Sequence, residues 1–469
     1  MAPATSSRPS LLAITASSPN RGAGAETVRQ RPAARSNTGT WRVYPAWLGW
    51  LVMALVLRAL LSANFQSATS PQSAIKGWDF QIVYLAAMRL NNGQSLYGPD
   101  NSSSSPSSAY LYTPLLAEAL RPLATFSYET ALRLWFFATS LALLAAVWLY
   151  TRAAGLSLRN TMPVTLLMVT ALHFWPVTLD QDLGNINGVL LACVCGMLLS
   201  ARTENDTGVA IWIALAALLK TWMIGLLLYL VLRRAWRALS ISLGLAGAGA
   251  VLLFAALPSG QFSRFIASNR QMAAQSDQVS QSILGAASRH LAPNPLVTPL
   301  VDNRAAFLLA NALGALAVCG GMLAMWKAGP RLDPYREQLR LGLVMSSILL
   351  VIPVSYQVYH VFDLALIWTL LLPSKPMRHA LTAGALALGC YLLLTLRWPT
   401  MTPLPDYVRH GVATLETSAG LFLRLGLWAL GLTALLVWSR DLRSPHGSLS
   451  TREADEAQLG MLDVDYGCE

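Results

Sequence analysis

An aspartate flanked by aromatic residues is the first group in the chain that could do chemistry. Asp79 stands in the run Gly77-Trp78-Asp79-Phe80, soon after the first apolar stretch. An acid between Trp and Phe has restricted hydration, which raises its pKa and suits it to abstracting a proton. The alternative is that Asp79 caps a helix beginning near Phe80. Residue chemistry alone favours the cap.

Two further polar groups interrupt apolar sequence. The stretch Asp180–Asn187 contains paired acids and amides, and we expect it to form a turn between two spans. Two acids two residues apart could hold a divalent cation, although such turns usually cap helices. Lys220 interrupts the run 211–232, where a cation requires a carboxylate or phosphate partner unless it extends to the interface.

Three other segments carry hydroxyl, amide or imidazole groups. Tyr110–Leu116 predicts a short helix at the membrane surface, started by a proline, in which Tyr112 contacts substrate or anchors the interface. Ser280–Gly285, followed by Arg289 and His290, is typical of polyol or phosphate binding but also of any polar loop. In Ser355–Asp363, His360 and Asp363 are three residues apart and could form a hydrogen-bonded pair, or His360 could be a core histidine.

The composition indicates the class of protein in which these groups are found. Of the 469 residues, 54% are hydrophobic and 12% are charged, against roughly 25% charged in a soluble domain. The apolar residues form runs of about 20, the length of a helix that crosses a bilayer core. The sequence therefore excludes a soluble enzyme and predicts an all-α, polytopic transmembrane protein.

The net charge of +11 indicates topology rather than a nucleic-acid partner, because the arginines lie in the loops between apolar runs. These loops all face the cytoplasm only if two runs are broken, near Lys220 and near Pro353–Tyr359. About twelve membrane segments result, within a range of 10 to 13 and including short or re-entrant helices, with both termini cytoplasmic. The predicted spans, counted before these breaks, are 44–63, 129–150, 161–179, 185–200, 208–232, 238–257, 305–326, 341–373, 379–397 and 418–438.

The chain divides into a catalytic membrane region and two tails. Residues 1–43 are expected to be a disordered basic cytoplasmic tail, although an organelle transit peptide has a similar composition. The membrane region, 44–438, has outer loops at 64–127 and 258–304, and 439–469 is expected to be an acidic cytoplasmic tail. The five scattered cysteines are assigned no chemistry, and no metal site is expected.

Taken in order, these motifs resemble glycosyltransferase family 87, the polyprenyl-phosphate-mannose-dependent mannosyltransferases with the multi-span GT-C fold. The matching pieces span most of residues 77–363. Three positions depart from the family pattern, namely Thr221 after the lysine, Ser280 before the glutamine and Val361 after the histidine. The motifs are Asp-Phe…Tyr…Ala-Ala…Gly…Tyr (79–97), Tyr-x-Tyr-x-Pro-Leu (110–115), Gly-Asn-x-Asn (184–187), Leu-Lys (219–220), Gln-Ser-x-x-Gly (281–285) and Tyr-His (359–360).

The resemblance implies an enzyme that moves a hexose, in particular mannose, from a polyprenyl monophosphate to an acceptor hydroxyl with inversion. Asp79 would be the general base, which overturns the preference for a cap. His360 would orient the reacting groups or assist near the phosphate, and Lys220 and Arg289 would offset its charge. No cofactor is implied. The substrate-binding residues would be Lys220, Arg289, Gln281, Tyr112, Tyr359, Asn185 and Asn187.

The expected partners are the lipid-linked donor, a glycan or glycolipid acceptor and membrane lipids, without nucleic acid. The expected location is the cytoplasmic membrane, with the active site facing outward. Broken helices also occur in secondary transporters, which bind solutes at discontinuous spans, and a third hypothesis is a non-catalytic partner in envelope-glycan assembly. Transfer from a lipid donor that depends on Asp79 would separate the enzyme from both alternatives.

Overall fold

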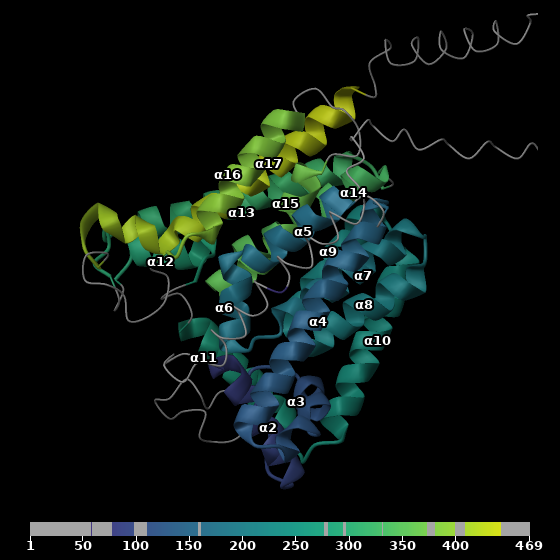
Figure 1. Ribbon diagram of the computed structural model, residues 1–469. Helices are drawn as coiled ribbons and strands as arrows, with labels where there is room; N and C mark the ends of the chain where they lie inside the picture. Colours follow the sequence, from purple (N-terminus) through teal and green to yellow (C-terminus); the bar gives the residue numbers. More distant parts are fainter. Residues whose placement is uncertain are drawn as a thin grey trace, which may run out of the picture. The chain divides into compact units, whose positions relative to one another are not determined.

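In the computed structural model the described residues form helices and contain no strand (Figure 1). The predicted tail 1–43, all of the first predicted span 44–63 except residue 58, and nearly all of the tail 439–469 lie outside the described residues. The described residues are 58, 77–97, 110–157, 161–275, 280–293, 297–330, 332–372, 380–398 and 409–441.

The predicted all-α class is confirmed for these ranges. The described part of the segment 64–127 contains three helices, α2 (Trp78–Asn91), α3 (Pro114–Leu120) and η3 (Leu123–Thr125). The loop 258–304 contains α11 (Gln261–Gln275) and α12 (Ile283–Leu291). The remaining helices are α4 (Tyr128–Ala154), α5 (Thr161–His173), α6 (Trp175–Leu183), α7 (Asn187–Arg202), α8 (Asp206–Leu219), η4 (Thr221–Leu226), α9 (Leu227–Arg233), α10 (Trp236–Ala255), α13 (Arg304–Lys327), α14 (Pro334–Val351), η6 (Gln357–Phe362), α15 (Asp363–Leu371), α16 (Ala380–Thr395), η8 (Gly411–Ser418) and α17 (Ala419–Asp441).

Two groups of packed helices position the polar segments. In the first group α7 packs against α4 and α8, and α8 packs against α10. In the second group α14 packs against α15 and α17, and α16 packs against α15 and α17. The short helix η6 contacts both α6 and α7, so the segment that carries His360 is in contact with the first group.

Both predicted helix breaks are confirmed. Helix α8 ends at Leu219, and Lys220 is extended, with φ −146° and ψ 112°, before η4 begins. Helix α14 ends at Val351, and Ile352 is extended. Pro353 explains this second break, because a proline disfavours the helical conformation of the residue before it.

One predicted span is wrong in its details. The run 161–179 was expected to be a single helix, but α5 and α6 are bent by 53° where they meet. Pro176 in the first turn of α6 gives the reason, because proline is favoured at a helix start and disrupts a helix interior. Helix α6 then continues to Leu183, so Asp180 belongs to its last turn rather than to the expected connecting turn.

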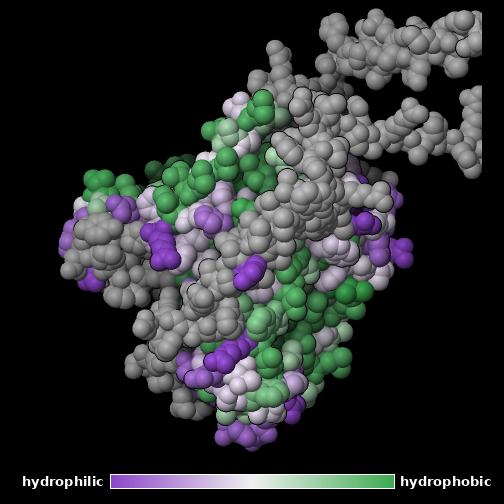
Figure 2. All heavy atoms as spheres, viewed as in Figure 1, coloured by the Kyte–Doolittle hydropathy of each residue, from purple (hydrophilic) through white to green (hydrophobic). Residues whose placement is uncertain are grey.

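Among the described residues, four helical stretches are long and apolar enough to cross a membrane, and the bent pair α5–α6 would be a fifth. Five shorter apolar stretches accompany them among the described residues, so the expected count of about twelve membrane segments stays a prediction. Figure 2 shows hydrophobic residues over α4, α8 and α10 and polar residues around α2 and α3. The four stretches are Tyr128–Ala154, Trp236–Ala255, Arg304–Lys327 and Gly411–Val437.

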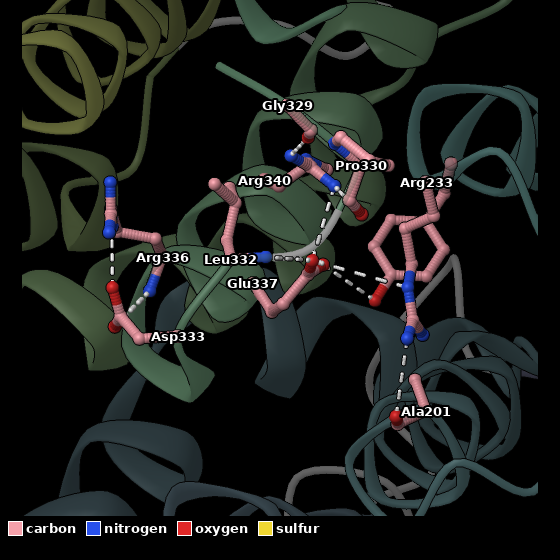
Figure 3. Close-up of polar contacts among 10 residues, drawn as sticks. Ala201, Arg233, Gly329, Pro330, Leu332, Asp333, Arg336, Glu337 and Arg340 are labelled. Carbon is pink, nitrogen blue, oxygen red and sulfur yellow. Dashed lines mark hydrogen bonds and ion pairs between the residues drawn. The ribbon is translucent and has the colours of Figure 1, made fainter. Parts of the chain in front are cut away.

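Glu337 joins three segments through a buried polar cluster (Figure 3). Its carboxylate accepts hydrogen bonds from the Tyr229 hydroxyl at 3.1 Å, from Arg340 Nη1 at 3.1 Å and from the Leu332 backbone N–H at 3.2 Å. Arg233 Nε lies 4.0 Å from the same carboxylate. This Glu337 cluster ties α9 and α14 to the segment that follows α13.

Candidate active site

Asp79 lies in the first turn of α2, and its side chain does not cap that helix. The N-cap residue is Gly77, in the left-handed conformation with φ 66°, and no side chain caps α2. The Gly77 N–H donates to the Asp182 carbonyl at 2.7 Å, and the Gly77 carbonyl accepts from the Tyr128 hydroxyl at 3.0 Å. These bonds hold the start of α2 against α6 and α4. The helix-cap interpretation of Asp79 is therefore wrong.

A chain of hydrogen bonds links two carboxylates to one ammonium group. Asn185 Nδ2 donates to Asp79 Oδ2 at 2.6 Å, and Asn187 Nδ2 donates to Asp180 Oδ1 at 2.7 Å. Lys220 Nζ donates to Asn185 Oδ1 at 3.3 Å and to Asn187 Oδ1 at 3.1 Å. Each amide therefore accepts from the cation and donates to an anion, which fixes the orientation of both amides.

Glycine at position 184 makes this arrangement possible. Gly184 ends α6 in the left-handed conformation, φ 65°, which glycine adopts without strain. A Cβ atom at this position would lie 2.6 Å from the Cβ of Phe80. The turn after α6 therefore packs directly on α2, and Asn185 reaches the residue that precedes Phe80.

Two tyrosine rings enclose the ammonium group of Lys220. Its Nζ lies 4.4 Å from the ring centroid of Tyr359 and 5.6 Å from that of Tyr112, and the residue is buried. Aromatic faces attract a cation and exclude water from it. The Tyr359 ring also packs against Trp222, with centroids 5.4 Å apart.

The electrostatics of Asp79 follow from burial and one nearby charge. Burial raises the pKa of the Asp79 carboxyl above its usual range, and the positive charge of Lys220 and the Asn185 hydrogen bond oppose that rise. Burial also raises the pKa of Tyr112 well above its usual value, and the charge of Asp79 adds to this. The Asp79 carboxylate is therefore more basic than an exposed one, and the neighbouring Tyr112 phenol stays neutral.

Gln281 and Arg289 belong to a second group, which fastens the 258–304 loop to the start of α17. The Gln281 backbone N–H donates to the Ser355 carbonyl, and its Nε2 donates to the Thr417 carbonyl at 2.7 Å. Arg289 Nη1 donates to the Ser280 carbonyl at 2.7 Å, and Nη2 donates to the Ser418 hydroxyl at 2.6 Å. The Arg289 side chain is fully buried by these contacts.

His360 belongs to the same group of polar residues as Gln281 and Arg289, and it lies beside an ion pair. Its Nδ1 is 2.7 Å from Asp363 Oδ2 and 3.0 Å from Arg424 Nη2. Arg424 Nε donates to the same carboxylate at 3.0 Å, and Nη1 donates to the Ser355 hydroxyl at 2.9 Å. His360, Asp363 and Arg424 are all buried. The predicted pairing of His360 with Asp363 is confirmed.

The candidate residues therefore fall into two adjacent groups, joined by the peptide bond between Tyr359 and His360. The first group, called the Asp79 cluster below, contains Asp79, Tyr112, Asp180, Asn185, Asn187, Lys220 and Tyr359. The second, called the His360 cluster, contains Ser280, Gln281, Arg289, Ser355, His360, Asp363, Ser418 and Arg424.

Sequence reasoning missed Arg424 and left Asp180 out of the site. Arg424 stands alone as a cation in the apolar run 419–437, which is a signal that it has a polar partner or a function. Its partner Asp363 lies 61 residues earlier, and no local pattern joins the two. Within the described residues, no group of three or more His, Cys, Asp or Glu side chains could hold a metal ion.

Apolar helices that enclose buried acid, amide and ammonium groups define the class as an integral membrane protein with a polar site. The sequence model of glycosyltransferase family 87 matches residues 110–353, more than half of the chain, and the chain belongs to that family. It is therefore a membrane glycosyltransferase. The matched range contains five of the seven residues of the Asp79 cluster, all but Asp79 and Tyr359, and only Ser280, Gln281 and Arg289 of the His360 cluster. No curated protein matches the chain.

Proposed function

We propose that this glycosyltransferase moves a hexose, in particular mannose, from a polyprenyl-phosphate donor to a hydroxyl of a lipid-linked or envelope glycan acceptor. The reaction inverts the anomeric centre. The acceptor oxygen bonds to C1 as the bond from C1 to the phosphate oxygen breaks, and the hydroxyl proton passes to the Asp79 carboxylate. The leaving group departs as polyprenyl phosphate and needs no general acid.

The observation that carries this proposal is the environment of Asp79. A carboxylate with a pKa raised by burial is a stronger base than an exposed one, and the Asn185 hydrogen bond holds it in place. Lys220 supplies a positive charge beside it, which offsets the charge of the donor phosphate. Arg289 is the second candidate for that role. Tyr112, Tyr359, Asn187 and Gln281 are assigned to substrate binding.

Replacing the carboxylate tests the proposal. Asp79→Asn keeps the size and hydrogen-bonding reach of the side chain but removes the base, so transfer should fall by about 100-fold or more. The measurement is the rate of sugar transfer by purified protein supplied with a panel of polyprenyl-phosphate sugars. Glu118→Gln is the matched control, since it neutralises a surface carboxylate on α3 that pairs with the exposed Arg121. Near-normal turnover by Asp79→Asn would contradict the assignment of the base.

The same panel separates this function from the other two hypotheses. A transporter would exchange a labelled solute without consuming any lipid-linked sugar, and an assembly partner would be indifferent to Asp79. Membership of a glycosyltransferase family favours transfer over both.

A further inference from the structure

A histidine with one unpartnered nitrogen lies in the His360 cluster. The Nε2 atom of His360 is buried and makes no hydrogen bond, whereas Nδ1 is in contact with Asp363 and Arg424. Buried polar atoms are nearly always hydrogen-bonded, and an exception requires an explanation. A role for Nε2 in binding a ligand is one such explanation.

The neighbours of Nδ1 determine which nitrogen carries the proton. Nδ1 cannot donate to the Asp363 carboxylate and accept from the Arg424 guanidinium at the same time. The 2.7 Å contact with Asp363 is the shorter of the two and lies in the range of a charge-assisted N–H···O bond. A nitrogen lone pair at that distance from an ionised carboxylate would be repelled, so the proton is on Nδ1.

The charges around the ring keep it neutral. Arg424 Nε is 3.0 and 3.2 Å from the two oxygens of Asp363, and Ser346 donates to Oδ1 at 3.2 Å. The carboxylate is thus already balanced by the guanidinium. A second positive charge on the ring would lie 3.0 Å from Arg424 Nη2. Neutral imidazole with the proton on Nδ1 leaves Nε2 as a pure hydrogen-bond acceptor.

Glycine at position 420 leaves the approach to Nε2 free of a side chain. A Cβ atom there would lie 2.5 Å from His360 Nε2 and 3.1 Å from Gln281 Oε1. Two acceptor atoms therefore face Gly420, the Nε2 lone pair and the Gln281 side-chain oxygen, and the latter already accepts from the Leu421 N–H at 3.2 Å. A group that hydrogen-bonds to Nε2 must be a donor, and the ionised phosphate of a lipid-linked sugar has no donor.

We propose that Asp363 and Arg424 are positioning residues that hold His360 neutral with its proton on Nδ1, so that Nε2 accepts a hydrogen bond from a hydroxyl of a sugar substrate. This rests on the proposed function and refines it, because it assigns His360 to a hydroxyl instead of the donor phosphate. Asp79 remains the group that takes the proton of the reacting hydroxyl.

The protonation state is tested without any activity measurement. In full-length protein labelled with 15N-histidine, the His360 resonances are assigned by their loss in His360→Phe, since the chain has six histidines. We expect a protonated Nδ1 and a bare Nε2. Asp363→Asn presents an amide N–H to Nδ1 and should move the proton to Nε2, as such exchanges do in carboxylate–histidine pairs. An imidazolium, or a proton on Nε2 in the unsubstituted protein, would overturn the proposal.

Three probes identify the ligand by its effect on the bare nitrogen. Polyprenyl-phosphate mannose carries sugar hydroxyls on the donor, octyl mannoside carries them on an acceptor mimic, and polyprenyl phosphate carries none. We expect one of the first two to shift the Nε2 resonance and polyprenyl phosphate alone to leave it unchanged. A shift with polyprenyl phosphate alone would overturn the hydroxyl assignment, as would no shift with any probe.

Two glycine variants on α17 form a matched pair for kinetic measurements. Gly420→Ala fills the approach to Nε2, whereas Gly426→Ala adds the same methyl group where no atom lies within 4 Å. We expect Gly420→Ala and Asp363→Asn to lower kcat by on the order of 100-fold, and Gly426→Ala to leave it unchanged. Arg424→Lys keeps the charge, so it should retain more activity than Arg424→Met. It should also keep the histidine tautomer of the unsubstituted protein. Equal kcat for the two glycine variants would contradict the proposal.

The two proposals fail separately. If the unsubstituted protein transfers sugar from no polyprenyl-phosphate donor, the proposed function is wrong, while the tautomer and the Nε2 shifts remain measurable. If transfer depends on Asp79 but His360 carries its proton on Nε2, the proposed function stands and the inference about His360 fails.

Discussion

Asn185 forms hydrogen bonds to both the Asp79 carboxylate and the Lys220 ammonium group. It donates to Asp79 and accepts from Lys220, so one side chain sets the position of the carboxylate and of the ammonium group. Asn187 repeats this arrangement with Asp180. The Gly-Asn-x-Asn motif thus has a physical reading, in which each amide separates a cation from an anion.

Removing one amide should therefore weaken catalysis without removing the base. Asn185→Leu keeps the volume of the side chain but deletes a hydrogen bond to a charged group, and we expect kcat/KM to fall by about 10- to 100-fold. Asn311→Leu, the same exchange on α13, where Asn311 bonds only to the Phe307 carbonyl among the contacts described, is the control and should retain full activity. Equal activity in both variants would argue against a role for the Asn185 amide.

The acid side of the pH profile should report Asp79. Its raised pKa means that the base is lost as pH falls through a value above 3.8, the usual carboxyl pKa, so kcat/KM should decline there. The positive charge of Lys220 lowers the pKa of Asp79, and Lys220→Gln should therefore move the decline to higher pH. Lys327→Gln, at the end of α13, should leave the profile unchanged. A decline that moves to lower pH in Lys220→Gln would contradict this electrostatic picture.

The residue types indicated which residues belong to the candidate site, but they did not indicate which of those residues contact one another. Asp79, Lys220 and His360 stood out because charged or polar groups are rare in apolar sequence. Their partners were harder to predict, since Asn185 reaches Asp79 across 106 residues and Arg424 reaches Asp363 across 61. Such pairs depend on how distant helices pack, which local spacing does not encode.

At the scale of elements, breaks in helices create the site. Lys220 follows α8, Asn187 begins α7 and Asp180 lies in the last turn of α6, so three helix ends meet at one point. Backbone groups at a helix end lack partners within the helix, which makes these ends polar. The breaks near Lys220 and Pro353 could be predicted from charge and proline. The bend between α5 and α6 was missed because the run is apolar on both sides of Pro176.

The Glu337 cluster should be important for stability. Glu337→Ala would leave the fully buried side chain of Arg340 without its carboxylate, which costs about 3 kcal/mol or more in comparable buried pairs. Glu118→Ala removes a carboxylate with the same three-residue spacing from an exposed pair with Arg121, and should cost less than about 1 kcal/mol. Thermal unfolding in detergent measures both. Similar losses in the two variants would show that the Glu337 cluster contributes nothing beyond a surface pair.

At the scale of the whole molecule, the Glu337 cluster lies at one end of α14, and the candidate site lies at the other. The Glu337 cluster involves the end of α9 and the start of α14, whereas the Asp79 and His360 clusters follow the end of α8 and the end of α14. The arginine-rich connections near Arg233 and Lys327 are at the Glu337 end. By the positive-inside rule, that end is predicted to face the cytoplasm and the site to face outward.

Single cysteines test this orientation. In a variant with its five native cysteines replaced, Asp302→Cys in the 258–304 loop should react with an impermeant maleimide in intact cells. Glu204→Cys, between α7 and α8, should react only after the membrane is made permeable. Both positions are exposed, so access to the reagent depends on the side of the membrane. The reverse pattern would invert the predicted topology.

The long helices α10 and α13 are little involved in these clusters. Only 11% of the most apolar stretch of each is buried within the protein, against 44% for α4 and α17. Side chains such as Leu252 on α10 and Leu316 on α13 are exposed, so they have few neighbours that a change of shape could disturb. The exposed positions on these two helices need to be hydrophobic but need no particular shape. Over evolutionary time these two helices should therefore exchange Leu, Val, Ile and Phe freely, while α14, buried along almost its whole length, should accept very few such exchanges.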